Sequence, residues 1–137
     1  MGGIISALRG DDAAAAASER ASSADCDSRV SSFHSANRWQ LHLNSLKESN
    51  QLLVIDFTAA WCGPCKFMKP ALQHMSVQFT DVEFAMIDVD ELPDVSKEFG
   101  VQAMPTFVLM KSGKVVDTVV GAKKDELERK IQKHRAV

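Results

Sequence analysis

The feature that most constrains the fold is a near-continuous apolar run over residues 52–58, which leads into two cysteines a few residues later. A strand that is apolar at almost every position must be covered on both faces, so this run predicts a central strand between two layers of helices. The cysteines, Cys62 and Cys65, lie where the strand gives way to a helix expected to begin near Gly63-Pro64. Two thiols at this spacing on such a junction can close a small disulfide ring and open it again, as thiol-disulfide exchange requires.

The rest of the chain supplies the other elements of such a sheet. Apolar periodicity and turn residues predict strands over 30–33, 82–89, 106–110 and 115–120, and helices over 36–49, 63–79, 93–99 and 124–133. Ser35 should cap the first helix, and the glycine-bearing loop over 111–114 favours a hairpin. The order of elements predicts an α/β protein with a central mixed five-stranded sheet flanked by four helices.

The helix that follows the cysteines carries apolar residues at helical spacing, which predicts its buried face. These residues are Phe67, Ala71, Leu72, Met75 and Phe79. Pro70 lies inside the same run, and we expect it to kink the helix.

Composition divides the chain into two parts. Residues 1–28 are rich in Ala, Ser, Asp and Gly and contain no aromatic residue, so we expect a disordered extension followed by one globular domain over 29–137. The 16 Lys and Arg are balanced by 18 Asp and Glu, which argues against a nucleic-acid partner. The apolar runs are shorter than the roughly 20 residues that cross a bilayer.

Cysteine usage favours a reducing compartment. The chain has 3 cysteines, too few for a secreted disulfide framework, and its first residues lack the apolar core of a secretory signal. We therefore expect a cytoplasmic protein. A pair of cysteines at this spacing also occurs in zinc sites, but those sites usually have four ligands, and His74 offers only one more nitrogen. We expect no metal and no cofactor besides the Cys62–Cys65 disulfide.

The two cysteines should have different roles. The free N–H groups and dipole of the helix N-terminus favour an anion at Cys62, which lowers the pKa of its thiol and makes it the attacking group. Lys66 either adds a nearby positive charge or is an ordinary solvated surface residue. Cys65 lies one turn further along, and we expect it to be shielded and to resolve the mixed disulfide.

Asp56 is the only charged residue in the central strand. Burial there would raise the pKa of its carboxyl towards the range that suits proton transfer, so Asp56 is the candidate base for Cys65. The alternative is that strand alternation directs Asp56 to solvent.

These motifs together resemble the thioredoxin family over residues 30–135. The residues that carry the resemblance are Asp56-Phe57, the segment Trp61-Cys62-Gly63-Pro64-Cys65-Lys66, Pro70, Met104-Pro105-Thr106, Gly113 and Gly121. Thr58, the stretch over 88–92 and the N-terminal extension are most similar to plant h-type thioredoxins.

The resemblance implies a thioredoxin fold and a substrate site. Pro105 would be cis and packed beside Cys62, and the Met104 backbone would pair with the substrate chain. An apolar docking surface around Cys62 would comprise Trp61, Gly63, Pro64, Met104, Pro105 and Gly121; Trp61 could instead be ordinary core. One departure is Met86, where many relatives carry a Lys beside the buried Asp56. Without that charge, Asp56 should be harder to ionise.

By the same resemblance, the protein would reduce disulfides of target proteins and be re-reduced by an NADPH-dependent thioredoxin reductase or by a glutaredoxin-glutathione system. A same-fold oxidase or isomerase is the first alternative, which the Gly63-Pro64 dipeptide disfavours. A redox-dependent binding module without turnover is the second, which the two intact cysteines disfavour.

The N-terminus carries a candidate lipidation signal. Residues 1–6, Met-Gly-Gly-Ile-Ile-Ser, fit the pattern for myristoylation of Gly2. A single myristoyl chain gives only reversible membrane attachment, and Asp11 and Asp12 oppose anionic lipid. Cys26 could be palmitoylated, glutathionylated or paired with another chain, or it could be an idle thiol. A mitochondrial or plastid transit peptide is the rival interpretation, and the acidic residues in this segment argue against it.

Mass spectrometry of the native protein tests the lipid prediction. Removal of Met1 followed by acylation should give an N-terminal peptide that begins at Gly2 and carries the added mass of a myristoyl group. A Gly2→Ala variant expressed in the same cells serves as the control and should lack that mass. A free or acetylated Gly2 in the native protein would contradict the prediction.

Overall fold

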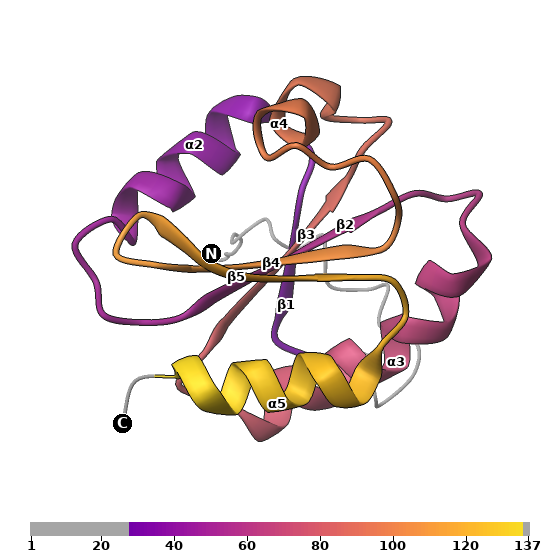
Figure 1. Cartoon of the computed structure of the whole chain (residues 1–137). Helices are drawn as coiled ribbons and strands as arrows, with labels where there is room; N and C mark the ends of the chain where they lie inside the picture. The colour runs from indigo at the N-terminus through magenta and orange to yellow at the C-terminus, as the bar shows by residue number, and fades with distance from the viewer. Residues whose placement is uncertain (1–27, 136–137) are drawn as a thin grey trace, which may run out of the picture.

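The computed structural model describes residues 28–135, which form a five-stranded sheet with a layer of helices on each face (Figure 1). The strands are β1 (Val30–Phe33), β2 (Leu53–Thr58), β3 (Glu83–Asp88), β4 (Thr106–Lys111) and β5 (Lys114–Val120). The helices are α2 (Ala36–Ser45), α3 (Gly63–Gln78), α4 (Pro93–Glu98) and α5 (Lys124–His134). Every predicted element is present within a few residues of its expected bounds.

The sheet is mixed, as predicted, with strand order β1-β3-β2-β4-β5. Strands β1, β3 and β2 are parallel, whereas β4 is antiparallel to both β2 and β5. The hairpin between β4 and β5 turns on Ser112 and Gly113, whose φ angles are 54° and 79°. Positive φ at both central residues defines the turn that fits the twist of paired strands, and it explains the glycine.

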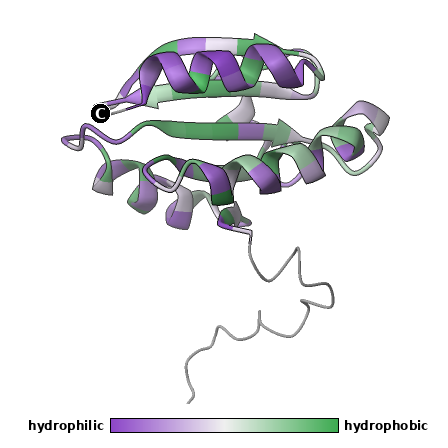
Figure 2. Ribbon diagram, turned by 90° about the horizontal axis from the view of Figure 1, so that it is seen from below, coloured by the Kyte–Doolittle hydropathy of each residue, from purple (hydrophilic) through white to green (hydrophobic). Residues whose placement is uncertain are grey.

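Two apolar cores cover the two faces of the sheet. Helices α3 and α5 lie on one face, and α2 and α4 lie on the other (Figure 1). Side chains alternate along β2, so Val54 enters the α3/α5 core while Leu53 and Ile55 enter the α2/α4 core. Along the helices hydrophilic and hydrophobic residues alternate, whereas the strands are mostly hydrophobic (Figure 2). Strand β2 is therefore buried on both faces, as its sequence predicts.

Helix α2 begins as predicted and ends early. The Ser35 hydroxyl accepts a hydrogen bond from the Arg38 N–H at 3.4 Å and caps the N-terminus. The helix ends at Ser45 rather than near residue 49, because the Leu46 N–H bonds to the Leu43 carbonyl and the Ser45 hydroxyl donates to the His42 carbonyl. These contacts close a tighter final turn in place of another α-helical turn.

The buried face of α3 differs from the prediction at its first turn. Phe67 was expected in the core, but it is 69 % exposed, and Met68 is buried instead at 1 %. Adjacent helical residues lie about 100° apart, so only one of the two can face the sheet. Cys65, Leu72 and Met75 share the face of Met68. The helix is continuous through Pro70, and the kink there stays a prediction.

The predicted extension over residues 1–28 falls almost wholly outside the described part of the chain, and so does Gly2. Among residues 28–135, no helix has both the length and the apolar composition that a membrane crossing requires.

Leu72→Ala tests the α3/α5 core. Leu72 is 0 % exposed, so loss of its side chain should leave a cavity and lower the free energy of unfolding by roughly 2–5 kcal/mol. Guanidinium unfolding of the oxidised protein measures this change. Leu41 of α2 is 70 % exposed, and Leu41→Ala is the matched control, expected within about 0.5 kcal/mol of the parent. Equal effects of the two substitutions would contradict this description of the core.

Candidate active site

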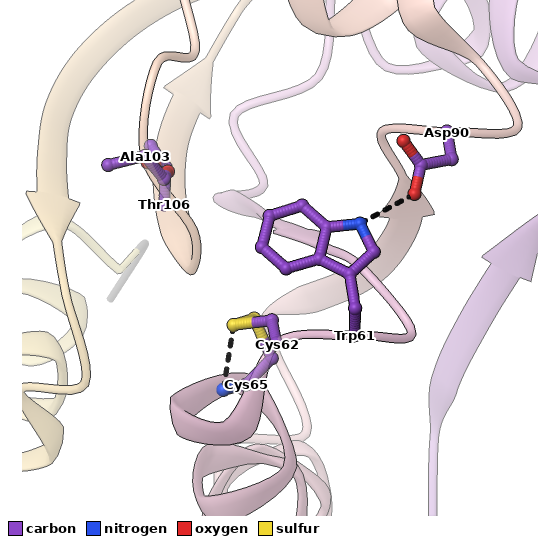
Figure 3. The surroundings of a disulfide bond; sticks show 6 residues. All are labelled: Trp61, Cys62, Cys65, Asp90, Ala103 and Thr106. Atoms are coloured by element: carbon purple, nitrogen blue, oxygen red, sulfur yellow. Dashed lines mark hydrogen bonds between the residues drawn. A yellow bond between two sulfur atoms is a disulfide. The ribbon is translucent and has the colours of Figure 1, made fainter.

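The two cysteines lie at the carboxyl end of β2, where the chain turns into α3. They are joined by a disulfide whose Cα atoms are 5.3 Å apart (Figure 3). Cys62 is the N-cap residue of α3 and Cys65 lies in its first turn. Because β2 is buried on both faces, its position in the sheet is fixed. The position of its carboxyl end in turn fixes where the cysteines lie.

The start of α3 favours negative charge on Cys62. The Cys62 sulfur accepts a hydrogen bond from the Cys65 backbone N–H at 3.2 Å. Gly63 and Pro64 occupy the first helical positions, where the missing N–H of Pro64 costs no intrahelical bond. The N–H of Cys65 and the positive end of the helix dipole would therefore stabilise a Cys62 thiolate once the disulfide opens.

The disulfide lies in an apolar setting. Cys62 and Cys65 are 4 % and 5 % exposed, and they form a small cluster with Ala59, against which Val89 and Met104 pack. Little of either sulfur is open to solvent in this oxidised state.

The predicted cis-proline loop lies against this cluster through Met104. The Met104–Pro105 peptide bond is cis, as the family resemblance implies. The Gly121 N–H donates to the Pro105 carbonyl at 2.8 Å, which joins this loop to the end of β5. The Thr106 hydroxyl donates to the Ala103 carbonyl and closes the loop on itself (Figure 3). Predicted substrate-site residues from distant parts of the sequence therefore lie at the same end of the sheet.

Trp61 is 67 % exposed and so is not a core residue. Its indole N–H donates to the Asp90 carboxylate at 2.8 Å (Figure 3). The Asp90 backbone N–H in turn donates to the Asp88 carboxylate at 2.8 Å. The sequence reasoning did not identify Asp90 as a site residue, although the acidic stretch over 88–91 was visible. No spacing rule connects an indole with a carboxylate 29 positions away.

Asp56 lies in β2 and is 3 % exposed. Its Oδ1 atom has no hydrogen-bond partner in the described part of the chain. Burial of the carboxyl raises the pKa of Asp56 to about 7, because an unpaired charge is costly away from water. The alternative of a solvent-facing Asp56 is therefore wrong.

A cavity of about 270 Å³ connects Asp56 with Cys65. Its other lining residues are Thr58, Ala59, Ala60, Lys66, Lys69, Met86 and Asp88. Met86 stands opposite Asp56 in the pairing of β2 with β3, so the substitution noted in the sequence places an uncharged side chain beside the buried carboxyl. Within residues 28–135, no three His, Cys, Asp or Glu side chains gather in a way that could hold a metal ion.

Comparisons with known proteins agree with this geometry. Residues 31–133 match the family described as Thioredoxin. The chain is 56 % identical over 138 residues to Thioredoxin H2 of Arabidopsis thaliana, and the match covers 99 % of this chain and 100 % of the relative. The crystal structure of thioredoxin NaTrxh from Nicotiana alata is similar with a TM-score of 0.79 and 67 % identity, over 80 % of this chain and 95 % of that chain.

A second similar structure is described as the structural basis of the thiol resolving mechanism in yeast mitochondrial 1-Cys peroxiredoxin via glutathione/thioredoxin systems. It has a TM-score of 0.69 and 40 % identity, over 77 % of this chain and 98 % of that chain.

The buried Asp56 should make stability depend on pH. The folded protein keeps a proton on this carboxyl up to about pH 7, whereas the unfolded chain releases it near the ordinary pKa of 3.8. The contribution of Asp56 to the free energy of unfolding should therefore fall between these two pH values and stay low above them. Asp56→Asn removes this contribution, so the stability of the variant relative to the parent should rise by roughly 4 kcal/mol between about pH 4 and about pH 8.

Guanidinium unfolding of the oxidised proteins across this pH range measures the difference. Glu98→Gln, at an exposed carboxyl in α4, is the control and should give a flat difference. A flat difference for Asp56→Asn would mean that Asp56 has an ordinary pKa in the folded protein.

Proposed function

The chain belongs to the thioredoxin family and is a protein-disulfide reductase with Cys62 and Cys65 as its redox pair, and we propose a relay in which Cys62 attacks and Cys65 resolves. The observation that carries this assignment is the position of Cys62 at the N-cap of α3, with its sulfur accepting the Cys65 N–H. That position stabilises a thiolate on Cys62 and leaves Cys65 inside the first turn.

In the first step the Cys62 thiolate attacks one sulfur of a target disulfide. A bond forms between Cys62 and that sulfur, and the second target sulfur leaves as a thiolate and takes up a proton. In the second step the Cys65 thiol loses its proton and attacks the Cys62 sulfur, and the remaining target sulfur leaves as a thiolate and takes up a proton. The target gains two electrons and two protons in total, and the Cys62–Cys65 disulfide forms.

Asp56 is the base for the second step in this proposal. It lines the same cavity as Cys65, and its pKa of about 7 suits an acceptor that must both take and release a proton near neutral pH. The cavity of about 270 Å³ has room for water that could carry the proton between the two groups. With Met86 beside Asp56, no ammonium at that position helps the carboxyl to ionise.

Target binding belongs to the surface around the disulfide. Its proposed residues are Trp61, Gly63, Pro64, Met104, Pro105 and Gly121. The support is geometric: the Trp61 indole is exposed and held by Asp90, and Met104 packs on the cysteine cluster. The hydrogen bond between Gly121 and Pro105 fixes the two loops relative to each other.

Disulfide-containing proteins are the targets, and a reductase restores the dithiol. We propose an NADPH-dependent thioredoxin reductase as the electron donor, with the similarity to Thioredoxin H2 as support. A glutaredoxin-glutathione supply is the second candidate. Its support is the similar yeast mitochondrial structure, whose description concerns a peroxiredoxin resolved via glutathione and thioredoxin systems.

The proposed location is the cytoplasm, with reversible membrane attachment through acylated Gly2. The Gly2 pattern supports it, and mitochondrial or plastid import remains the alternative. The proposed domain organisation is an extension over 1–28 and a thioredoxin domain over 29–137. The family match over 31–133 lies within that domain.

Insulin reduction with three variants tests the relay. Cys62→Ser should abolish turnover, whereas Cys65→Ser should accumulate a mixed disulfide visible on a non-reducing gel, because the resolving thiol is gone. Asp56→Asn should still form the mixed disulfide but resolve it about 10²-fold more slowly, as expected when a general base is lost.

Glu98→Gln serves as the matched carboxyl control and should behave as the parent. Unchanged turnover in Asp56→Asn would remove Asp56 from the mechanism. A Cys65→Ser protein that binds insulin chains without capturing them would instead favour a binding module. A reduction potential far above that of cytosolic thiols would favour an oxidase.

A further inference from the structure

Helix α3 carries a line of exposed, mostly apolar residues that starts at the redox motif. Phe67 is 69 % exposed and Val77 is 44 % exposed. Exposed residues recur between them at steps of three and four, and this spacing places them all on one face of the helix. We call this face the α3 strip, and its members are Gly63, Phe67, Pro70, His74 and Val77, all exposed.

The α3 strip faces away from both cores. The core-facing side of the helix is formed by Cys65, Met68, Leu72 and Met75, so the strip adds nothing to the packing of the sheet. An exposed Phe within one turn of a reactive disulfide has no structural need, and contiguous exposed apolar surface commonly marks an interaction site. The strip is also continuous with the proposed docking surface, because Gly63 belongs to both.

The disulfide has positively charged residues on the side of α3 and negatively charged residues on the opposite side. Lys66 and Lys69 lie next to the strip, and neither forms an ion pair with any residue in the described range 28–135. Across the disulfide, Trp61 is held by Asp90 (Figure 3), and Glu91 and Asp94 follow that residue in the chain. A partner that lies along α3 therefore meets apolar surface edged by positive charge.

We propose that the α3 strip is a second docking surface for target polypeptides and that it favours targets with an apolar residue and acidic residues next to the reactive cysteine. This inference rests on the proposed reductase function and specifies which disulfides that function prefers. The apolar side chain packs against Phe67, and the acidic residues lie near Lys66 and Lys69.

The length of the strip sets the length of target that it can contact. Val77 lies 14 residues after Gly63, so the strip spans about 21 Å of helix at roughly 1.5 Å per residue. An extended peptide covers that distance with about six residues. Recognition should therefore extend roughly six residues beyond the target cysteine and no further.

Two other possible occupants of the α3 strip must be distinguished by experiment from a target polypeptide. The Arg29 N–H donates to the Ser76 hydroxyl at 2.9 Å, so the described chain begins beside the C-terminal part of α3, and residues 1–27 could compete for the strip. A second copy of the chain is the other competitor.

Synthetic disulfide peptides test the proposal with the full-length chain. Two peptides share one disulfide and one Leu two residues beyond the cysteine, and they differ only in carrying Glu or Lys at the next two positions. The parent should reduce the Glu peptide with a higher kcat/KM than the Lys peptide, and high salt should shrink the difference. Lys69→Glu should reverse the preference.

Phe67→Ser should lower kcat/KM for the Glu peptide about tenfold, as expected from lost apolar burial. The variant should react with a small aromatic disulfide, dithiobis-nitrobenzoate, as fast as the parent does, because the cysteines are unchanged. Leu41→Ser is the matched control: Leu41 is 70 % exposed on α2, and its loss should change neither rate.

Equal kcat/KM for the two peptides in the parent would overturn the charge preference, and an unchanged rate in Phe67→Ser would overturn the strip. Faster reduction of every peptide by Phe67→Ser would overturn the proposal in favour of residues 1–27 as the occupant. A dimer in sedimentation that Phe67→Ser dissociates would overturn it in favour of a second copy. Failure of the parent to reduce either peptide and the small disulfide would instead remove the proposed function itself.

Discussion

Strand β2 is buried on both faces, and the positions of the reactive groups follow from that burial. One face contributes to the α3/α5 core and the other to the α2/α4 core, so β2 has little freedom to shift or tilt. Its carboxyl end therefore presents the cysteines at a fixed point, where the N-terminus of α3 can stabilise a thiolate. The same burial encloses Asp56, the one charged residue of the strand.

The sequence was sufficient to predict the helices and strands and to identify the reactive groups. It was insufficient to predict which apolar residue of the first turns of α3 is buried and which residue holds the Trp61 indole. Continuous apolar runs predicted the buried strands because a surface strand would alternate with polar residues. Asp56 could be identified because it interrupts such a run. Phe67 and Met68 could not be separated, since both are apolar neighbours and the phase of a helix is set by what it packs against.

The hydrogen bond from Trp61 to Asp90 lay beyond the same reasoning. It depends on two loops that meet only after β2 and β3 pair in register. The proposed proton exchange by Asp56 and the proposed docking surface also cannot be established from the sequence pattern. The first depends on the position of Cys65, and the second depends on the target protein.

The two sides of helix α3 have different surroundings. Its inner side places Cys65 at the cavity that Asp56 shares, while its outer side carries Phe67 in contact with solvent. Under the proposed docking role, changes on the outer side should alter which proteins are recognised without altering how the disulfide reacts. Lys66 and Lys69 lie between the two sides and line the cavity, so the proposed recognition and the proposed proton transfer would influence each other at these two residues.

The burial of Asp56 also has an evolutionary consequence. Most positions in a core are held by selection for stability, but a carboxyl whose pKa is about 7 reduces stability at neutral pH. Drift under selection for folding alone would replace it, since proteins need only remain above a stability threshold. A descendant of this chain that kept the fold and abandoned turnover should lose Asp56 early. Under the proposed role of Asp56, the residue at this position should distinguish working reductases from lineages that retain only the scaffold.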